Sequence, residues 1–295
     1  MVESVGEVLS GKALAFIGSG TMAEAMIQVL VNKGLISPAQ ISASGPREER
    51  ARELSARYGV LGTTDNREAA EAADVVVLSV KPQVLPTVLM ELRGLIYPEG
   101  LVLSIVAGMC IETIVNGLQH PAVVRAMPNT PAQIGEGMTV WTASRGVDDR
   151  QHGQARAILR AMGHEIHVKD EGMLDMATAV SGTGPTYVFL MMEALTDAAV
   201  HLGFSRRVAE QLVTQTVLGS AMFTRETDRH LAEMRNMVTS PGGTSAEAIY
   251  QLEKGGLRTV LSKAVWAAYQ KSRLLGAANQ TPKDPNGFGI VDQGA

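Results

Sequence analysis

The segment Gly18-Ser19-Gly20-Thr21-Met22-Ala23 follows a compact apolar run, Ala13–Ile17, and opens a helical pattern. In such a strand–turn–helix unit the first glycine permits a tight turn, and the second lets a pyrophosphate approach the backbone. The small third residue lets the helix pack close to the sheet, while the helix start supplies oriented N–H groups. We predict that residues 18–22 bind a nicotinamide dinucleotide; an ordinary strand-to-helix turn is the alternative.

The ribose of such a coenzyme binds at the end of the second predicted strand, Gln40–Ser44. Domains that bind NAD place a carboxylate there, but this chain continues with Gly45, Pro46 and Arg47 and has its first carboxylate at Glu48. A 2′-phosphate repels a carboxylate and suits hydroxyl and guanidinium groups. We therefore predict NADPH, with Ser44 and Arg47 as ligands of its 2′-phosphate. NADH, with Arg47 as a solvated residue at a helix start, is the alternative.

Two further segments follow predicted strands. The apolar, β-branched run Ala73–Val80 is typical of a strand covered on both faces and leads into Lys81 and Pro82. Ligands of open parallel sheets lie outside the carboxyl ends of the strands. We expect Val80, Lys81 and Pro82 beside the coenzyme, with Lys81 also a candidate catalytic residue. Ala107 and Gly108 end the next strand and are expected under the nicotinamide.

The second half of the chain holds three unusual clusters. In the segment 125–131, Arg-Ala-Met-Pro-Asn-Thr-Pro, two prolines restrain the backbone around Asn129 and Thr130. The segment 181–185, Ser-Gly-Thr-Gly-Pro, predicts a bend between helices. The segment 240–245, Ser-Pro-Gly-Gly-Thr-Ser, precedes a helix, and successive N–H groups there form an anion nest suited to a small carboxylate. Each cluster could also be a plain connector.

Short apolar runs alternate with helical patterns in the first part of the chain. The predicted strands are Ala13–Ile17, Gln40–Ser44, Ala73–Val80, Leu101–Ala107, Ala122–Met127 and Met138–Thr142. Strands that alternate with helices predict an α/β domain, a doubly wound and mostly parallel sheet with helices on both faces. We assign residues 1–168 to this dinucleotide-binding domain.

The pattern changes after Lys169. The predicted helices are Glu171–Val180, Pro185–Leu202, Arg206–Thr224, Asp228–Val238, Ser245–Lys254 and Leu257–Leu275. We predict an all-α domain over residues 169–278 and a disordered tail, rich in glycine, proline and polar residues, over 279–295. The helix 185–202 is apolar over most of its circumference, so it needs burial on several sides. This predicts a homodimer in which helices of two chains interleave.

Composition excludes several classes. A chain of 295 residues with 45% hydrophobic content suits two domains. Only 4% aromatic residues and a net charge of -4 argue against a nucleic-acid partner. One cysteine, no signal-peptide pattern and no unbroken apolar span predict a cytoplasmic protein that does not enter a membrane. The six histidines show no ligand set, so no metal is expected.

Taken together, the clusters resemble pyrroline-5-carboxylate reductase, the enzyme of the last step of proline synthesis. The matching segments are Gly-Ser-Gly-Thr-Met-Ala at 18–23, Val-Lys-Pro-Gln at 80–83, Met-Pro-Asn-Thr-Pro at 127–131, Ser-Gly-Thr-Gly-Pro at 181–185 and Val-Thr-Ser-Pro-Gly-Gly-Thr-Ser at 238–245. The resemblance implies a Rossmann domain followed by a helical dimerisation domain, with dimers that can assemble into decamers. It also implies hydride transfer from NAD(P)H to the C=N carbon of pyrroline-5-carboxylate.

The resemblance further implies roles for single residues. Backbone amides of Gly242, Gly243 and Thr244 would hold the substrate carboxylate, and the hydroxyl of Ser245 would face the ring nitrogen as proton donor or positioner. Thr183 would contact the substrate, and Asn129 the coenzyme. The chain departs from the family pattern at Ser245, where most members have threonine, at Thr183, where serine is usual, and at Gly45-Pro46, where a polar pair is usual.

Other functions stay open at this point. One alternative is a related imine reductase of the same architecture that acts on a different cyclic substrate. A 3-hydroxyacid dehydrogenase would share the first domain, but it uses a lysine of the helical domain as acid–base, and this chain has none between Asp170 and Glu253. A module that senses NADP(H) without turnover would need the coenzyme loop but not the Pro-Gly-Gly nest.

Overall fold

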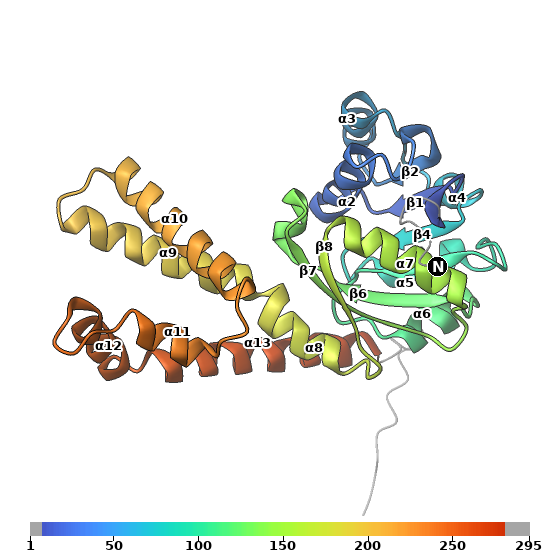
Figure 1. Cartoon of the computed structure of the whole chain (residues 1–295). Coiled ribbons are helices and arrows are strands. Elements are labelled where there is room, and N and C mark those ends of the chain that lie inside the picture. The colour runs from blue at the N-terminus through green and yellow to red at the C-terminus, as the bar shows by residue number, and fades with distance from the viewer. Residues whose placement is uncertain (1–7, 281–295) are drawn as a thin grey trace, which may run out of the picture. The chain divides into compact units, whose positions relative to one another are not determined.

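The structure, a computed structural model, describes residues 8–280 (Figure 1). These residues form two compact units. The first comprises residues 8–182 and 269–280, while the second comprises Thr183–Ala268. Most of the predicted disordered tail lies outside the described residues, and the last helix extends to Gln280.

The first unit is built on one sheet of eight strands in the order β3-β2-β1-β4-β5-β6-β7-β8. Neighbours from β3 to β6 pair in parallel, β7 runs antiparallel to β6, and β8 is parallel to β7. The strands are β1 Leu14–Ile17, β2 Ile41–Ser44, β3 Leu61–Thr63, β4 Val75–Leu78, β5 Leu101–Ser104, β6 Val123–Met127, β7 Gly137–Ala143 and β8 Gly163–His167. The predicted doubly wound, mostly parallel sheet is confirmed.

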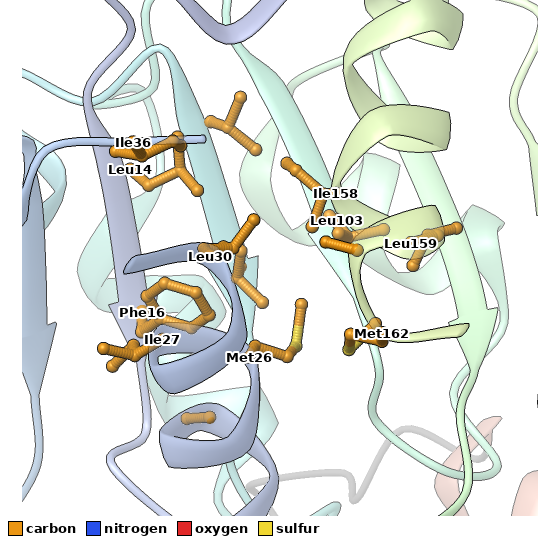
Figure 2. Close-up of a cluster of buried hydrophobic side chains, with 14 of the residues drawn as sticks. Leu14, Phe16, Met26, Ile27, Leu30, Ile36, Leu103, Ile158, Leu159 and Met162 are labelled. Carbon is orange, nitrogen blue, oxygen red and sulfur yellow. The ribbon is translucent and has the colours of Figure 1, made fainter. Parts of the chain in front are cut away.

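Helices cover both faces of this sheet, because alternate residues of each buried strand point to opposite sides. Leu14 and Phe16 of β1 join a cluster with α2 and α7, part of which is shown in Figure 2. Ala15 and Ile17 join a second cluster on the other face. The helices of this unit are α2 Thr21–Asn32, α3 Glu48–Tyr58, α4 Asn66–Ala70, α5 Leu85–Leu92, α6 Ile111–Leu118, α7 Asp149–Ala161 and α8 Met173–Ala177. Shorter turns are η1 Pro38–Gln40, η2 Thr130–Ile134 and the π-helical η3 Thr178–Gly182.

The second unit is helical. It contains α9 Gly184–His201, α10 Arg206–Arg225, α11 Leu231–Met237, α12 Thr244–Lys254 and the first part of α13 Leu257–Gln280. The sequence places the domain boundary earlier, after residue 168. The first unit continues to Gly182 because α8 and η3 bond to it: the Asn129 side-chain amide donates to the carbonyl oxygen of Ser181 at 3.0 Å.

Few side chains of the second unit are buried, namely Thr196, Ala209 and Val213. Large apolar side chains of α9 remain exposed instead, including Phe189 at 61% and Leu190 at 65%. Apolar surface of this extent marks an interaction site in a folded chain. The exposed apolar side chains of α9 therefore agree with the expectation from the sequence that this helix needs a partner.

Candidate active site

The glycine loop is held between the ends of β2 and β4. Gly18 has φ +105°, and a Cβ on it would lie 2.7 Å from the backbone nitrogen of Val80. Its amide donates to the carbonyl oxygen of Ser44 at 3.0 Å, and the Ser79 hydroxyl donates to the carbonyl oxygen of Gly18 at 2.8 Å. Only glycine fits here, because the conformation and the packed backbone both exclude a side chain. Ser79, which sequence reasoning missed, anchors the turn.

Gly20 serves a different purpose. It is exposed, has φ -77° and precedes α2, and a Cβ added to it would meet no atom within 4 Å. The space beside the Gly20 backbone is thus not filled by other protein atoms. The first N–H groups of α2 lack intrahelical acceptors and face outward with the positive end of the helix dipole. This arrangement suits the pyrophosphate of a dinucleotide.

A cavity of about 380 Å³ opens beside the loop. It is lined by Ser19, Gly20, Thr21, Glu24, Arg47, Glu49, Arg50 and Glu53. Arg47 is exposed at the start of α3 and makes no side-chain capping bond there. Within the described part of the chain Arg47 forms no ion pair, so its guanidinium is available to an anion in this cavity.

Arg50 is the functional neighbour that sequence reasoning missed. Its Nε donates to the carbonyl oxygen of Ser19 at 3.1 Å, and its guanidinium pairs with Glu24 and Glu53. Burial raises the pKa of Glu24, but hydrogen bonds from Arg50 and Tyr58 outweigh it and hold that pKa below its usual value. Arg50 therefore braces the loop against α2 and α3. The spacing Arg-x-x-Arg across one helical turn was the available signal.

Ser44 differs from the expectation. Its side chain is fully buried and its hydroxyl bonds to the carbonyl oxygen of Phe16 at 3.4 Å and to Oδ1 of Asn66 at 2.8 Å. It does not line the cavity. Gly45 follows it, and a Cβ on Gly45 would overlap the Ser19 hydroxyl. The Ser19 side chain thus occupies the space that a polar side chain at position 45 would need.

The segments expected near the nicotinamide follow adjacent strands. Val80, Lys81 and Pro82 come after β4, and Lys81 is exposed. Ala107 and Gly108 come after β5, and Gly108 is buried with φ +70°. Because β4 pairs in parallel with β1 and β5, these segments and the glycine loop lie at the same edge of the sheet.

Asn129 has its side-chain amide fully engaged. Its Nδ2 donates to the carbonyl oxygen of Ser181 at 3.0 Å, and its Oδ1 accepts from the backbone nitrogen of Met138 at 2.8 Å. The side chain therefore joins η3 to the start of β7.

The predicted anion nest is in the second unit, at the start of α12. Gly242 has φ +70°, and the amide of Gly243 donates to the carbonyl oxygen of Ser240 at 3.0 Å. Thr244 and Ser245 are the first two residues of α12, so their amides lack intrahelical acceptors. The geometry leaves outward-facing donors at a helix N-terminus, with the Ser245 hydroxyl beside them. Thr183 lies at the start of α9.

No group of three or more His, Cys, Asp or Glu side chains capable of holding a metal is found among residues 8–280. Within the same residues, no helix has the length and apolar character needed to cross a membrane.

Comparisons with known proteins agree with this arrangement. The family described as pyrroline-5-carboxylate reductase dimerisation matches residues 171–275, and the family described as NADP oxidoreductase coenzyme F420-dependent matches residues 13–108. The chain is 43% identical to a pyrroline-5-carboxylate reductase of Synechocystis, over 89% of this chain and 98% of the relative. It is 36% identical to that of Escherichia coli, over 90% and 98% of the two chains.

Solved structures give the same result. A pyrroline-5-carboxylate reductase from Coxiella burnetii matches with a TM-score of 0.83 and 39% identity, over 90% of this chain and 98% of the other. The pyrroline carboxylate reductase of Plasmodium falciparum with NADP bound matches with a TM-score of 0.83 and 30% identity, over the same shares. Identity at this level, extending over nearly all of the chain from the glycine loop to α13, places it in a single family. The chain belongs to the pyrroline-5-carboxylate reductase family.

Proposed function

We infer that this chain is an oxidoreductase that reduces 1-pyrroline-5-carboxylate to L-proline with NAD(P)H, the last step of proline biosynthesis. One observation carries this conclusion: the family's coenzyme loop and its Pro-Gly-Gly-Thr-Ser segment occur in one chain, each at the N-terminus of a helix. A sensing module would need only the first of these sites. The Rossmann domain, the coenzyme and the reaction class agree with the named relatives.

The reaction needs little from the protein beyond position and one proton. When bound, NAD(P)H supplies the hydride, which goes to the carbon of the C=N bond. A protonated imine is already electrophilic, so alignment and exclusion of water are the main tasks. As the hydride adds to carbon, the π electron pair of the C=N bond moves onto the ring nitrogen, and the product is a ring amine. The single proton that this nitrogen carries as a protonated imine comes from Ser245 or a bound water.

The nest at the start of α12 provides the carboxylate site. We propose that the amides of Gly242 and Thr244 donate to the substrate carboxylate. The amide of Gly243 is bonded to Ser240, so Gly243 contributes mainly by shaping the turn. The hydroxyl of Ser245 faces the ring nitrogen, and Thr183 completes the polar surroundings of the ring.

For the coenzyme, we propose that residues 18–22 hold the pyrophosphate and that Val80–Pro82, Ala107 and Gly108 surround the nicotinamide. We propose that Lys81 places a positive charge beside the nicotinamide and is a candidate catalytic residue. NADPH is the preferred coenzyme because the cavity beside the loop exposes Arg47.

The Arg47→Ala variant tests this preference. The KM for NADPH should rise about ten- to a hundredfold, as expected for the loss of a charge-assisted bond to phosphate. The KM for NADH should stay unchanged. Arg52→Ala, an exposed residue of the same helix, is the matched control. Equal effects of Arg47→Ala on both coenzymes would reject a role in binding the 2′-phosphate.

We propose that the chain forms a homodimer through its helical unit and that dimers assemble into decamers. The exposed apolar side chains of α9 and the matched dimerisation family support the dimer. The decamer rests on the resemblance to the family. Light scattering on the purified chain measures the mass directly: ten times the chain mass supports the decamer, and a monomer would refute both proposals.

We propose that the chain binds a small-molecule substrate and has no nucleic-acid or membrane partner; the net charge of -4 supports the absence of a nucleic-acid partner. We propose a cytoplasmic location, which suits a chain with one cysteine that has no internal partner.

A further inference from the structure

Arg125 is a buried charge that the proposed mechanism does not use. It lies on β6, and its side chain is 8% exposed. A guanidinium withdrawn from water is tolerated only where carboxylates pair with it. Two carboxylates do so: Glu171 at 2.8 Å and Asp175 of α8 at 3.6 Å.

Each of these carboxylates also bonds to a second element of the first unit. Oε1 of Glu171 accepts from the backbone nitrogen of Ile111, the first residue of α6, at 2.8 Å. Oδ1 of Asp175 accepts from the hydroxyl of Ser272 on α13 at 2.8 Å, and Ser272 is itself buried. Arg125 thus joins β6, α8, the start of α6 and the end of α13 through one connected network.

This network encloses the turn between β5 and α6. On one side of the turn, Ser104 of β5 pairs in register with Arg125. On the other side, Glu171 holds the first residue of α6. Gly108 lies between them with φ +70°, and a Cβ on it would lie 3.1 Å from the backbone nitrogen of Gly276 on α13. Gly276 lies four residues after Ser272, on the same face of α13 one turn later.

We propose that Arg125 is a positioning residue for hydride transfer. Through Glu171 and Asp175 it holds the Ala107–Gly108 turn, and it fixes the end of α13 against that turn. The inference rests on the proposed function, which puts this turn beside the nicotinamide. Arginine is required because its planar fork bridges two carboxylates, whereas the point charge of lysine serves one.

The test compares Arg125→Lys with the parent chain and with a control variant, Arg52→Lys. Arg52 is an exposed residue of α3 that pairs with Glu48. In Arg125→Lys we expect kcat to fall about tenfold, while the Kd of NADPH changes less than about threefold. Coenzyme affinity is preserved because the pyrophosphate and adenosine bind elsewhere, at the glycine loop. The Arg52→Lys variant should match the parent.

A deuterium isotope effect separates positioning from loss of folded enzyme. With deuterium at the transferred position of the nicotinamide, the isotope effect on kcat should increase in Arg125→Lys, because misalignment makes hydride transfer slower relative to other steps. A smaller amount of active enzyme would lower kcat and leave the isotope effect unchanged. Unchanged kcat, or a lower kcat with an unchanged isotope effect, would overturn the proposal.

Two further measurements keep the proposal testable. Ser272→Ala removes a single hydroxyl, so it should lower kcat by about threefold and also increase the isotope effect. If Arg125→Lys does not fold, the Ser272→Ala variant tests the proposal in its place. Hydrogen exchange of the amides at 107–111 in the NADPH complex should be about tenfold faster in Arg125→Lys. That readout needs no turnover, so an inactive parent chain would refute the proposed function and leave the network still testable. Unchanged exchange would refute the network's hold on the turn.

Discussion

A Gly20→Ala variant should fold as stably as the parent chain and yet bind NADPH about 30- to 100-fold more weakly, a loss of about 2–3 kcal/mol of binding free energy. The added methyl group meets no protein atom within 4 Å, so it introduces no steric clash in the folded chain. It occupies the space through which the pyrophosphate approaches the backbone and the start of α2. Thermal unfolding measures the first quantity, and titration of the nicotinamide fluorescence measures the second.

Gly18→Ala is the comparison that makes this prediction specific. Its Cβ would lie 2.7 Å from the backbone nitrogen of Val80, and φ +105° adds strain of about 1–3 kcal/mol for a residue with a side chain. This variant should lose both stability and coenzyme affinity. If Gly20→Ala binds NADPH as tightly as the parent chain does, the coenzyme does not lie across this loop.

A Ser245→Ala variant should lower kcat by about 10²- to 10⁴-fold, the range for removal of a positioned proton donor. The Kd of NADPH should remain unchanged, because Ser245 belongs to the nest and the coenzyme loop belongs to the other unit. Thermal stability should also hold, since Ser245 is the second residue of α12, where a hydroxyl is not needed for the helix. Steady-state kinetics and a fluorescence titration of the same preparation give both values.

Two companion variants sharpen that experiment. Ser245→Thr keeps the hydroxyl and should retain most activity. Ser220→Ala removes an exposed hydroxyl of α10 that bonds within its own helix, and it should change neither kcat nor the Kd of NADPH. Full activity in Ser245→Ala would show that a bound water supplies the proton and that the hydroxyl is dispensable.

The sequence predicted the architecture well where periodicity was strong. The buried strands β1 and β4 are wholly apolar, and β5 and β6 are apolar except for Ser104 and Arg125. The helices from α9 to α13 begin within about three residues of the predicted positions. The strand β3 was missed because Leu61–Thr63 is a short edge strand, with Leu61 56% exposed. Burial, on which the strand pattern depends, is incomplete there.

The local sequence pattern was less informative where the role of a residue depends on side chains from distant segments. Ser44 looked like a phosphate ligand, but its hydroxyl is bonded to Asn66 at 2.8 Å, a residue 22 positions away. The role of Arg50 depends on Glu24 in α2, and the role of Arg125 depends on three elements beyond its own strand. Such long-range pairings leave no periodic signal in the chain.

Hydride transfer from NAD(P)H to 1-pyrroline-5-carboxylate by this chain can be measured directly. The most direct measurement follows the loss of reduced-coenzyme absorbance with the purified chain and that imine, and identifies the product. We expect coenzyme oxidation that depends on the imine and forms one proline for each NADPH consumed. No oxidation above the imine-free rate with either NADPH or NADH would contradict it.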